Sequence, residues 1–592
     1  MSNIESKASI PKEQKQSLDN IKNVFQIPIT FNKNVKKLKE NIVNDLELIK
    51  PIDKDEFAIY DTIFKPSNKA ANNILEQFAN HYTIDTEYLQ DTQILIESFH
   101  STDLNTIYNK FNIDHYELNN VFTLWEEIKA ETGFREKYLY IDWEFAKHLN
   151  NNPAFLQLMS CYNIASPLLS LCLPILILIV PFIIIKIKGI TLSIQEYINT
   201  LKIIASNHAI FKIVTEFHSV DNGQKLYLAI SAAFYLFSIY QNILVCVRFY
   251  SNMQKIHNYL FRFKKYIEYT LEIMDYHTAK SNTLTSYYQF NENLSYHQNI
   301  LSTLYDKINS ITPFSFSFSK ISEIGHIMHT FYQLYENKEY NDAFLYSFGF
   351  NGYFTLINQI NTHVQDNKIV KTTFTKKGKP IFKQMYYPKF IENPTDSIIK
   401  NNCNLNKNMI ITGPNASGKT TTLKTALINI ILSQQIGYGC FDSLKLCPYD
   451  NIHCYLNIPD TSGRDSLFQA EARRCKEIID SIDKFNDNKH FCIFDELYSG
   501  TNPDEAITSA SAFMNYIVKH DNVTCLLTTH YVKLCKKLAK NKKIKNYNMK
   551  SQKKNDNFEY TYILEEGISK IKGGFKVLKD MEYPQEILDN TK

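Results

Sequence analysis

The sequence has 592 residues, and 65 Lys and Arg against 61 Asp and Glu give it a formal net charge of +4. With only 16 Gly and 17 Pro, it is not a collagen-like chain, a linker or a turn-rich all-β protein, because tight turns usually need Gly. A hydrophobic fraction of 44% excludes a disordered chain, and the near-balanced charge argues against a wholesale polyanion binder. Seven glycines lie in residues 1–400 and nine in 401–592. We therefore expect a mainly helical N-terminal region and a different structure in the last third.

The eleven cysteines include no Cys-x-x-Cys pair, so neither a disulfide framework nor a zinc ribbon is indicated. Cys440, Cys447 and Cys454 recur every seven residues, but this is not the spacing of a zinc site. We expect buried thiols in a reducing, intracellular compartment, with a metal or redox role as the alternative. The first residues are polar and lack a signal-peptide core.

Four segments follow one another along the chain. Residues 1–150 are polar and carry apolar positions at helical spacing, for example in 38–48 and 74–78. Residues 151–250 hold two apolar segments with a connecting loop. Residues 251–368 show long helical patterns at 253–274 and 284–308, typical of levers or a bundle. From 369 to 592 short β-like runs give way to strand–loop–helix alternation.

The two apolar segments are 164–185 and 226–247, each of 22 residues. Each is long enough to cross a bilayer core of about 30 Å. Buried helices of a large helical domain are the alternative. Pro167, Pro174 and Pro181 favour the membrane, where interior prolines are tolerated better. Two spans would leave both flanks, and with them the C-terminal domain, in the cytosol.

One sequence motif predicts a nucleotide-binding site. An apolar strand at 408–411 leads into a loop and a helical run at 422–432, which is the setting of the G-x-x-x-x-G-K-[ST] phosphate loop. The expected nucleotide-binding residues are Gly413, Pro414, Asn415, Ala416, Ser417, Gly418, Lys419, Thr420 and Thr421. Backbone N–H groups at a helix N-terminus favour anions, so Lys419 would reach the β- and γ-phosphates and the Thr420 hydroxyl would ligate Mg²⁺. ATP and Mg²⁺ are the expected cofactors.

Two further strand ends complete a predicted ATPase site. The strand 490–494 ends in Asp495 and Glu496; the first is placed to hold Mg²⁺ and the second to act as base on the attacking water. The strand 523–527 leads to His530, which is placed to sense the γ-phosphate. We thus expect Lys419, Glu496 and His530 as catalytic residues, and Thr420 and Asp495 as metal ligands.

These motifs resemble the ATPase domain of the MutS family of DNA mismatch-repair proteins, which are ABC-type P-loop ATPases. The similar segments are 412–420 (TGPNASGKT), 463–471 (GRDSLFQAE), 495–501 (DELYSGT), 528–531 (TTHY) and the closing stretch 567–587. The resemblance covers about residues 385–590. It implies that Ser466 contacts the nucleotide of a partner subunit, that Ser499, Gly500 and Thr501 face that subunit, and that Glu496 is the catalytic base. The partner would be a second copy or a related MutS-like subunit.

The sequence also departs from the family. Nothing in 1–150 matches the Phe-x-Glu wedge that reads mismatches, and the Phe390-Ile391-Glu392 triplet lies at the entrance to the ATPase domain. In the helix-start segment, Leu467 and Gln469 replace the usual Thr and Met. The chain is similar to a shorter MutS-related branch, some of whose members carry membrane spans.

Ten lysines lie between 533 and 554. A solvated helix end and hairpin is one interpretation, and contact with DNA phosphates or an anionic membrane is the other.

Two functional hypotheses follow. The first is a dimeric MutS-like ATPase that couples its nucleotide state to binding of mismatched or branched DNA, in repair or recombination. The alternative is a membrane-anchored ATPase that acts on a membrane or protein partner without mismatch recognition.

Overall fold

The computed structural model describes residues 20–590 except 54, 131, 190–192, 208–220, 316, 395–396, 459–465, 555–556 and 570–580. The described residues fall into two compact units. Unit 1 is drawn from Met1–Asn119, Tyr269–Gln298 and Phe344–Lys592, and unit 2 from Asn120–Glu268 and Asn299–Ala343. A helical N-terminal region followed by a mixed α/β domain is thereby confirmed. The four-segment division stays a prediction.

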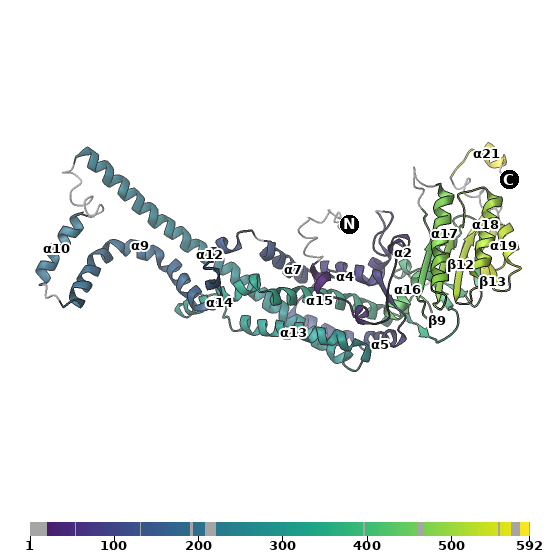
Figure 1. Ribbon diagram of the computed structural model, residues 1–592, viewed down its shortest axis with the longest axis horizontal. Helices are drawn as coiled ribbons and strands as arrows, with labels where there is room; N and C mark the ends of the chain where they lie inside the picture. Colours follow the sequence, from purple (N-terminus) through teal and green to yellow (C-terminus); the bar gives the residue numbers. More distant parts are fainter. Residues whose placement is uncertain are drawn as a thin grey trace. The chain divides into compact units, whose positions relative to one another are not determined.

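The C-terminal part of unit 1 contains a six-stranded sheet of order β10-β11-β12-β7-β13-β14, some strands of which are labelled in Figure 1. All neighbouring strands are parallel except the β13–β14 pair. Its strands are β7 (Asn408–Thr412), β10 (Asn451–Tyr455), β11 (His490–Asp495), β12 (Val523–Thr529), β13 (Ile544–Lys554) and β14 (Asn557–Glu566). Near-continuous apolar runs form β7, β11 and β12 because both of their faces are covered. The predicted strands at 408–411, 490–494 and 523–527 are confirmed.

Helices cover both faces of this sheet. Because side chains alternate along a strand, Ile410, Phe494 and Leu527 face a core shared with α17, α18 and α19. The opposite face packs on α16, which contacts β11 and β12. These helices are α16 (Lys419–Ile436), α17 (Leu467–Lys484), α18 (Pro503–Ile517) and α19 (Val532–Leu538); α21 (Gln585–Asn590) follows near the end of the chain.

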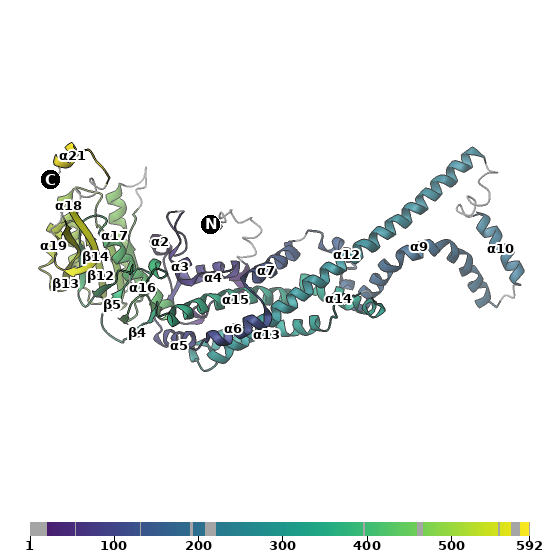
Figure 2. The same ribbon diagram turned by 180° about the vertical axis from the view of Figure 1, so that it is seen from behind.

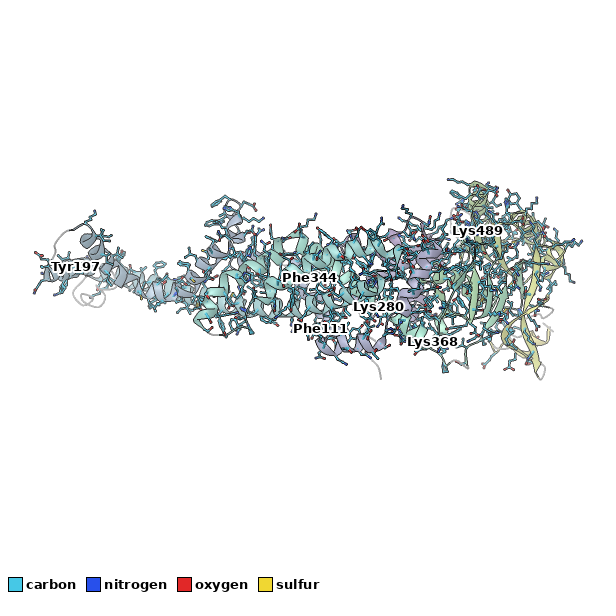
Figure 3. The ribbon with its side chains drawn as sticks, turned by 90° about the horizontal axis from the view of Figure 1, so that it is seen from below. Phe111, Tyr197, Lys280, Phe344, Lys368 and Lys489 are labelled. Atoms are coloured by element: carbon cyan, nitrogen blue, oxygen red, sulfur yellow. The ribbon has the colours of Figure 1, made fainter. Side chains whose placement is uncertain are left out.

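A smaller sheet of order β4-β9-β5-β6 stands at the entrance to this domain. Its strands are β4 (Thr373–Phe374), β5 (Ile381–Met385), β6 (Asn401–Asn404) and β9 (Ser443–Leu446); β3 (Val370–Lys371) pairs with β8 (Tyr438–Gly439). Between β5 and β6 lies the short helix η4 (Pro388–Phe390). Glu392, just after η4, forms ion pairs with Lys65 and Lys368, the latter labelled in Figure 3.

The N-terminal part of unit 1 contacts α16 through α5 and β2. The helices of this part are η1 (Pro28–Phe31), α2 (Glu40–Asp45), α3 (Ile59–Phe64), α4 (Lys69–Asn80), α5 (Thr86–Glu97) and α6 (Ser101–Phe111), and its hairpin is formed by β1 (Val35–Lys37) and β2 (His81–Thr83). The Gln435 side chain, buried near the end of α16, donates to the carbonyls of Phe78 and His81 and accepts from the Tyr60 hydroxyl. Lys424 on the same helix pairs with Glu47 at 2.9 Å. The helix of the phosphate loop is therefore fixed to the N-terminal segment as well as to the sheet.

Eight of the eleven cysteines are buried as expected, whereas Cys161, Cys172 and Cys246 are partly exposed. Cys440, Cys447 and Cys454 are buried free thiols. Burial raises the pKa of the Cys440 thiol to about 12, so it stays protonated.

Unit 2 is helical. Four long helices have residues in both units: α7 (His115–Ala130), α12 (Asn222–Ser281), α13 (Tyr288–Asn309) and α15 (Lys338–Gln365). Those of unit 2 alone are α8 (Phe134–Lys137), η2 (Lys147–Asn151), α9 (Pro153–Ile187), α10 (Ile194–Asn207) and α14 (Phe318–Glu336); η3 (Thr285–Tyr287) precedes α13. The predicted helices 253–274 and 284–308 lie within α12 and largely within α13. α10 contacts α9, and Figure 2 shows it near the ends of α9 and α12.

α14 crosses α9 closely at Gly325, where an added Cβ would meet the backbone nitrogen of Gln157 at 2.9 Å. Gln157 holds the crossing, because its amide donates to the carbonyl of Ile321 and accepts from the Gly325 N–H. α9 contacts α12 as well, since the Tyr235 hydroxyl donates to the carbonyl of Ser170 at 2.9 Å.

The two predicted apolar segments lie in α9 and α12. By length and composition alone, Pro153–Cys172 and Asn222–Ser281 are long and apolar enough to cross a membrane. Only 6% of the most apolar 18-residue stretch of Asn222–Ser281 is buried. For Pro153–Cys172 the buried share of that stretch is 22%. Membrane insertion stays a prediction.

Candidate nucleotide site

The phosphate loop leaves the carboxyl end of β7, in the middle of the sheet. Gly418 is the N-cap of α16 and has φ 92°, a conformation that side chains disfavour. Gly413 has no room for a Cβ, which would lie 2.7 Å from the Ser417 hydroxyl. The carbonyl of Pro414 accepts from that hydroxyl at 2.7 Å and from the Lys419 ammonium at 3.1 Å. The loop thus wraps tightly over the start of α16.

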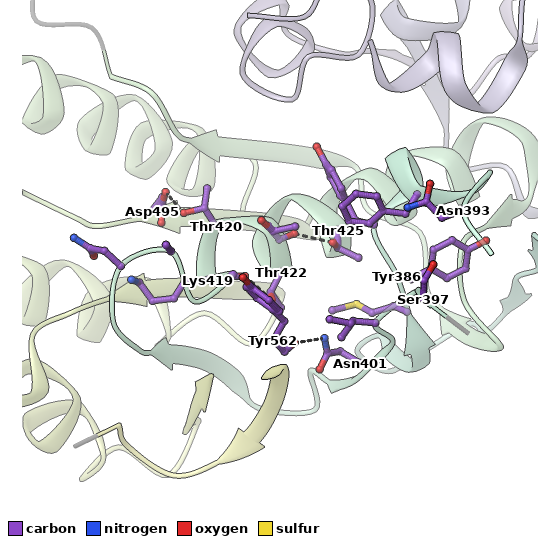
Figure 4. A pocket seen from close by; sticks show the side chains of 18 of the residues that line it. Tyr386, Asn393, Ser397, Asn401, Lys419, Thr420, Thr422, Thr425, Asp495 and Tyr562 are labelled. Carbon is purple, nitrogen blue, oxygen red and sulfur yellow. Dashed lines mark hydrogen bonds between the residues drawn. The ribbon is translucent and has the colours of Figure 1, made fainter. Parts of the chain in front are cut away.

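Two carboxylates meet this loop from β11. The Thr420 hydroxyl donates to Asp495 at 2.8 Å, and the other oxygen of Asp495 accepts from the Thr528 hydroxyl at the end of β12. Glu496 lies with its Oε1 3.9 Å from Lys419 Nζ and 3.4 Å from His530 Nδ1. The predicted catalytic and metal-binding residues are therefore brought together at one edge of the sheet. Figure 4 labels three of them, Lys419, Thr420 and Asp495.

The charges of this cluster depend on one another. Burial lowers the pKa of the Lys419 ammonium from its ordinary value, and Glu496 and Asp495 oppose that effect. The hydrogen bond from His530 holds the pKa of the Glu496 carboxyl below its ordinary value. A carboxyl is ionised near neutral pH at its ordinary pKa as well as at a lowered one, so Glu496 can accept a proton there.

The backbone around these residues is strained. Ala416, Glu496 and Tyr498 have φ values of 61°, 50° and 58°, in the left-handed region that non-glycine residues seldom occupy. Such strain clusters at functional sites, where surrounding contacts hold it.

A cavity of about 710 Å³ opens beside the loop. The phosphate-loop helix and the two carboxylates form one wall. Residues that the sequence did not predict at the site form the other wall: Met385, Tyr386, Tyr387, Phe390, Asn393, Ser397, Ile399, Asn401 and Tyr562. Asn401 donates to the carbonyl of Tyr562 and joins the two sides of this wall (Figure 4). Its aromatic side chains give the cavity an apolar end, and the loop, with the Lys419 ammonium, gives it a polar end.

The residues expected to face a partner subunit lie elsewhere. Ser466, Ser499, Gly500 and Thr501 do not line the cavity. Ser466 is exposed at the N-cap of α17. Its hydroxyl accepts from the Gln469 N–H, and the Gln469 side chain accepts from the Ser466 N–H, which makes a capping box. The replacement at 469 therefore has a structural role.

The loop 499–501 is tied to the same helix. Glu471, buried in α17, accepts from Ser499 and Gly500, while Thr501 donates to Glu505. A Cβ on Gly500 would lie 2.9 Å from the Phe468 nitrogen, so the loop packs directly on the start of α17. The rest of the predicted helix-start segment, 463–465, lies outside the described residues.

Comparison with known proteins agrees with this geometry. Residues 409–592 match the family model of MutS domain V. The chain is 29% identical over 212 residues to a DNA mismatch repair protein MutS of Orientia tsutsugamushi, a match that covers 34% of this chain and 23% of that protein. It is 33% identical over 127 residues to an Endonuclease MutS2 of Staphylococcus carnosus, covering 21% of this chain and 16% of that protein.

A DNA mismatch repair protein msh3 of Botryotinia fuckeliana is 26% identical over 235 residues, 36% of this chain and 20% of that protein. The chain thus matches less than a quarter of the length of each of these relatives. The resemblance to the MutS family is confirmed through the C-terminal domain. The likeness to the shorter branch with membrane spans stays a prediction.

Proposed function

We propose that the protein is a MutS-like ATPase that binds and hydrolyses ATP, works as a dimer and couples its nucleotide state to DNA binding. The observation that carries this proposal is the convergence of Lys419, Thr420, Asp495 and Glu496 beside a cavity of about 710 Å³. Relatives named for DNA mismatch repair support the DNA part.

The phosphates of ATP would lie over the loop. The N-terminus of α16 presents N–H groups and a favourable dipole to an anion. The Lys419 ammonium, now 3.1 Å from the Pro414 carbonyl, would donate to a phosphate oxygen instead. The adenine ring of ATP would extend toward the aromatic side chains of Tyr387 and Phe390 in the cavity wall.

The residues at the carboxyl edge fit Mg²⁺, because a threonine hydroxyl and a carboxylate are the hard oxygen ligands that this ion prefers. Thr420 and Asp495, already 2.8 Å apart, would hold it. When bound, the ion would neutralise charge that develops on the phosphates.

In hydrolysis, Glu496 would take a proton from water. The water oxygen then forms a bond to the γ-phosphorus as the bond to the β–γ bridging oxygen breaks, giving ADP and phosphate. His530, 3.4 Å from Glu496, keeps that carboxyl ionised and positions it.

Replacing Glu496, the proposed catalytic base, is the direct test of ATPase activity. Glu496→Gln should bind ATP normally and hydrolyse it at least about 100-fold more slowly, the usual contribution of a general base. Glu477→Gln, an exposed carboxylate on α17, is the matched control. An unchanged rate in the Glu496 variant would remove it from the base role.

The dimer has its own test. If Ser466 acts in the partner's site, Lys419→Ala and Ser466→Ala should each be inactive alone. Mixed dimers should recover one intact site, in which the Lys419 of one subunit meets the Ser466 of the other. Failure of the mixture to regain activity would contradict this arrangement.

DNA coupling requires retention on DNA. The protein with ATP trapped by Glu496→Gln should bind mismatched or branched DNA differently from the nucleotide-free protein, and salt should weaken binding. Absence of salt-sensitive binding to mismatched, branched or homoduplex DNA would reject the DNA part and leave the ATPase part standing.

A second candidate function, a membrane-anchored ATPase acting on a membrane or protein partner, is favoured by the exposed apolar side chains of α9 and α12, such as Leu168 and Phe234. Recovery of the full chain in the soluble fraction without detergent would rule it out.

A further inference from the structure

Two nucleophilic side chains meet between the smaller sheet and the central sheet of unit 1. Cys447 directly follows β9, and Lys489, labelled in Figure 3, directly precedes β11. The Nζ atom of Lys489 lies 2.5 Å from the Sγ atom of Cys447, although the two residues are 42 positions apart (489 − 447). A cysteine beside a lysine is of the kind that reacts, unlike a cysteine among apolar side chains. Neither residue lines the nucleotide cavity.

The backbone holds Lys489 in this position. Its N–H donates to the Asp450 carboxylate at 3.0 Å, and its carbonyl accepts from the N–H groups of Asp450 and Asn451 at 3.0 and 3.1 Å. Asp450 lies only three residues after Cys447, and Pro448 restricts the backbone between them. The two side chains therefore leave backbone segments that are tied to each other.

The sulfur atom is open toward the lysine nitrogen. The Cys447 thiol donates to the carbonyl of Lys376 at 3.3 Å, so its proton lies on that side. Across the described part of the chain, the Lys489 side chain has no ion pair and no hydrogen bond other than that to Cys447. No other protein group competes with the sulfur for this nitrogen.

Burial decides which oxidant can reach the sulfur. Cys447 is 4% exposed, whereas Lys489 is partly exposed. A bulky thiol such as glutathione is too large to approach this sulfur. Dioxygen is small and has no charge or hydrogen-bonding group whose burial would cost free energy.

The spacing of the two atoms fits a bridge of one atom. Two atoms bonded to a common third atom lie about 2.5 Å apart, as the N and C atoms of one residue do. One oxygen atom can therefore bond to both Sγ and Nζ while the two side chains keep their places. A direct S–N bond would require them to move together.

We propose that Cys447 and Lys489 form a covalent crosslink through one oxygen atom, Sγ–O–Nζ, with dioxygen as the oxidant. The reactants are the thiol and the neutral amine. One oxygen atom of O₂ bonds to Sγ and to Nζ as the O–O bond breaks. The other leaves as water with two of the three protons of the S–H and NH₂ groups, and the third proton stays on nitrogen. Sulfur and nitrogen give two electrons each, which reduces the dioxygen. The site is independent of the nucleotide site.

The test uses the full chain, purified under reducing and oxygen-free conditions. Exposure to dioxygen should raise its mass by about 14 Da, because one oxygen is gained and two hydrogens are lost, and oxygen-18 gas should raise it by about 16 Da. Digestion should release a joined peptide that contains both Cys447 and Lys489. Dithiothreitol should restore the separate peptides and the original mass.

Variants separate this crosslink from other oxidation. Lys489→Arg keeps the charge and the hydrogen-bond donor but removes the nucleophilic amine, because a guanidinium does not lose its proton in proteins. This variant and Cys447→Ser should give no joined peptide. Lys445→Arg, at an exposed position of β9, is the matched control and should crosslink as the unchanged chain does. The oxygen-18 measurement on the unchanged chain tests the proposal even if a variant does not fold.

Three results would overturn the proposal. A joined peptide about 2 Da lighter than the sum of its two parts would mean a direct S–N bond. Oxygen gained at Cys447 with Lys489 still free would mean oxidation of the sulfur alone. Equal masses with and without dioxygen would mean that the two side chains share only a hydrogen bond.

Discussion

The carboxylate of Glu471 accepts hydrogen bonds from both the N–H and the hydroxyl of Ser499, at 3.0 and 2.9 Å. Its other oxygen accepts from the N–H of Gly500 at 3.2 Å. Since Glu471 lies one turn after the helix start at Ser466, α17 and the loop after β11 are held as one piece. The two segments expected to face a partner subunit thus have a fixed relation to each other.

Glu471→Gln should slow ATP hydrolysis about tenfold. The amide group of Gln would turn a donor toward one N–H of the loop, and an unmatched buried donor costs about 1–3 kcal/mol. ATP binding should change little, because Glu471 does not line the cavity. Steady-state hydrolysis and nucleotide titration measure the two effects. A rate equal to that of the Glu477→Gln control would show that the loop keeps its position without this carboxylate.

Removal of the metal should stop hydrolysis. A chelator in excess over Mg²⁺ should abolish turnover, and added Mg²⁺ should restore it. Asp495→Asn should raise the Mg²⁺ concentration needed for half-maximal rate about tenfold or more, because an amide is a weaker ligand than a carboxylate. Asp504→Asn, exposed on α18, is the control. If Asp495→Asn needed no more Mg²⁺ than the unchanged protein, Asp495 would not be a ligand of the ion.

His277 should make unit 1 sensitive to acid. It is fully buried among Phe290, Phe350 and Tyr353, and burial lowers its pKa from 6.5 to about 3. In the unfolded chain it binds a proton below about pH 6.5, whereas the folded state does not, so stability falls as pH falls from 6.5 toward 3. Between pH 6.5 and 5 this group costs about 2 kcal/mol.

His277→Phe should therefore lose less stability than the unchanged chain over that interval. Urea unfolding followed by circular dichroism at pH 7.5 and pH 5 gives the difference. The same loss in both proteins would mean that His277 takes up its proton in the folded state.

The lysines of 533–554 form two sets. Lys533, Lys543, Lys545 and Lys550 pair with carboxylates of the chain. Lys536, Lys537, Lys540 and Lys542 lie exposed without a carboxylate partner in the described part of the chain. The side chains of Lys553 and Lys554 lie outside the described residues. These four unpaired lysines are therefore the ones whose charge could contact an anionic partner such as DNA.

If DNA binds to this surface, changing the unpaired set to Gln should flatten the dependence of log K on log salt, by up to about 0.9 for each phosphate that the lysines no longer neutralise. The paired set changed to Gln is the matched control and should leave the slope nearly unaltered. Equal slopes in all three proteins would favour the solvated helix end and hairpin that the sequence also allows.

The catalytic cluster could be predicted from the sequence because short motifs encode it. A glycine-rich loop and two strand ends fix Lys419, Asp495 and His530 locally, and parallel strands then bring their ends to one edge. Tyr387 and Tyr562 carry no such motif. They reach the cavity only through the second sheet and the β13–β14 pair, and they lie 175 residues apart in the sequence (562 − 387). Glu471 lies in a segment that resembles the family, but its hydrogen bonds to Ser499 depend on tertiary packing.

The hydrogen bond between Gln435 and Phe78 joins positions 357 residues apart. During synthesis the contacts of the N-terminal segment with α16 can therefore form only after α16 has left the ribosome, whereas all of unit 2 is complete before that. A fragment that begins at residue 369 would lack this segment and expose the buried side of α16. Biochemical work on the nucleotide site consequently needs the N-terminal segment in the same chain.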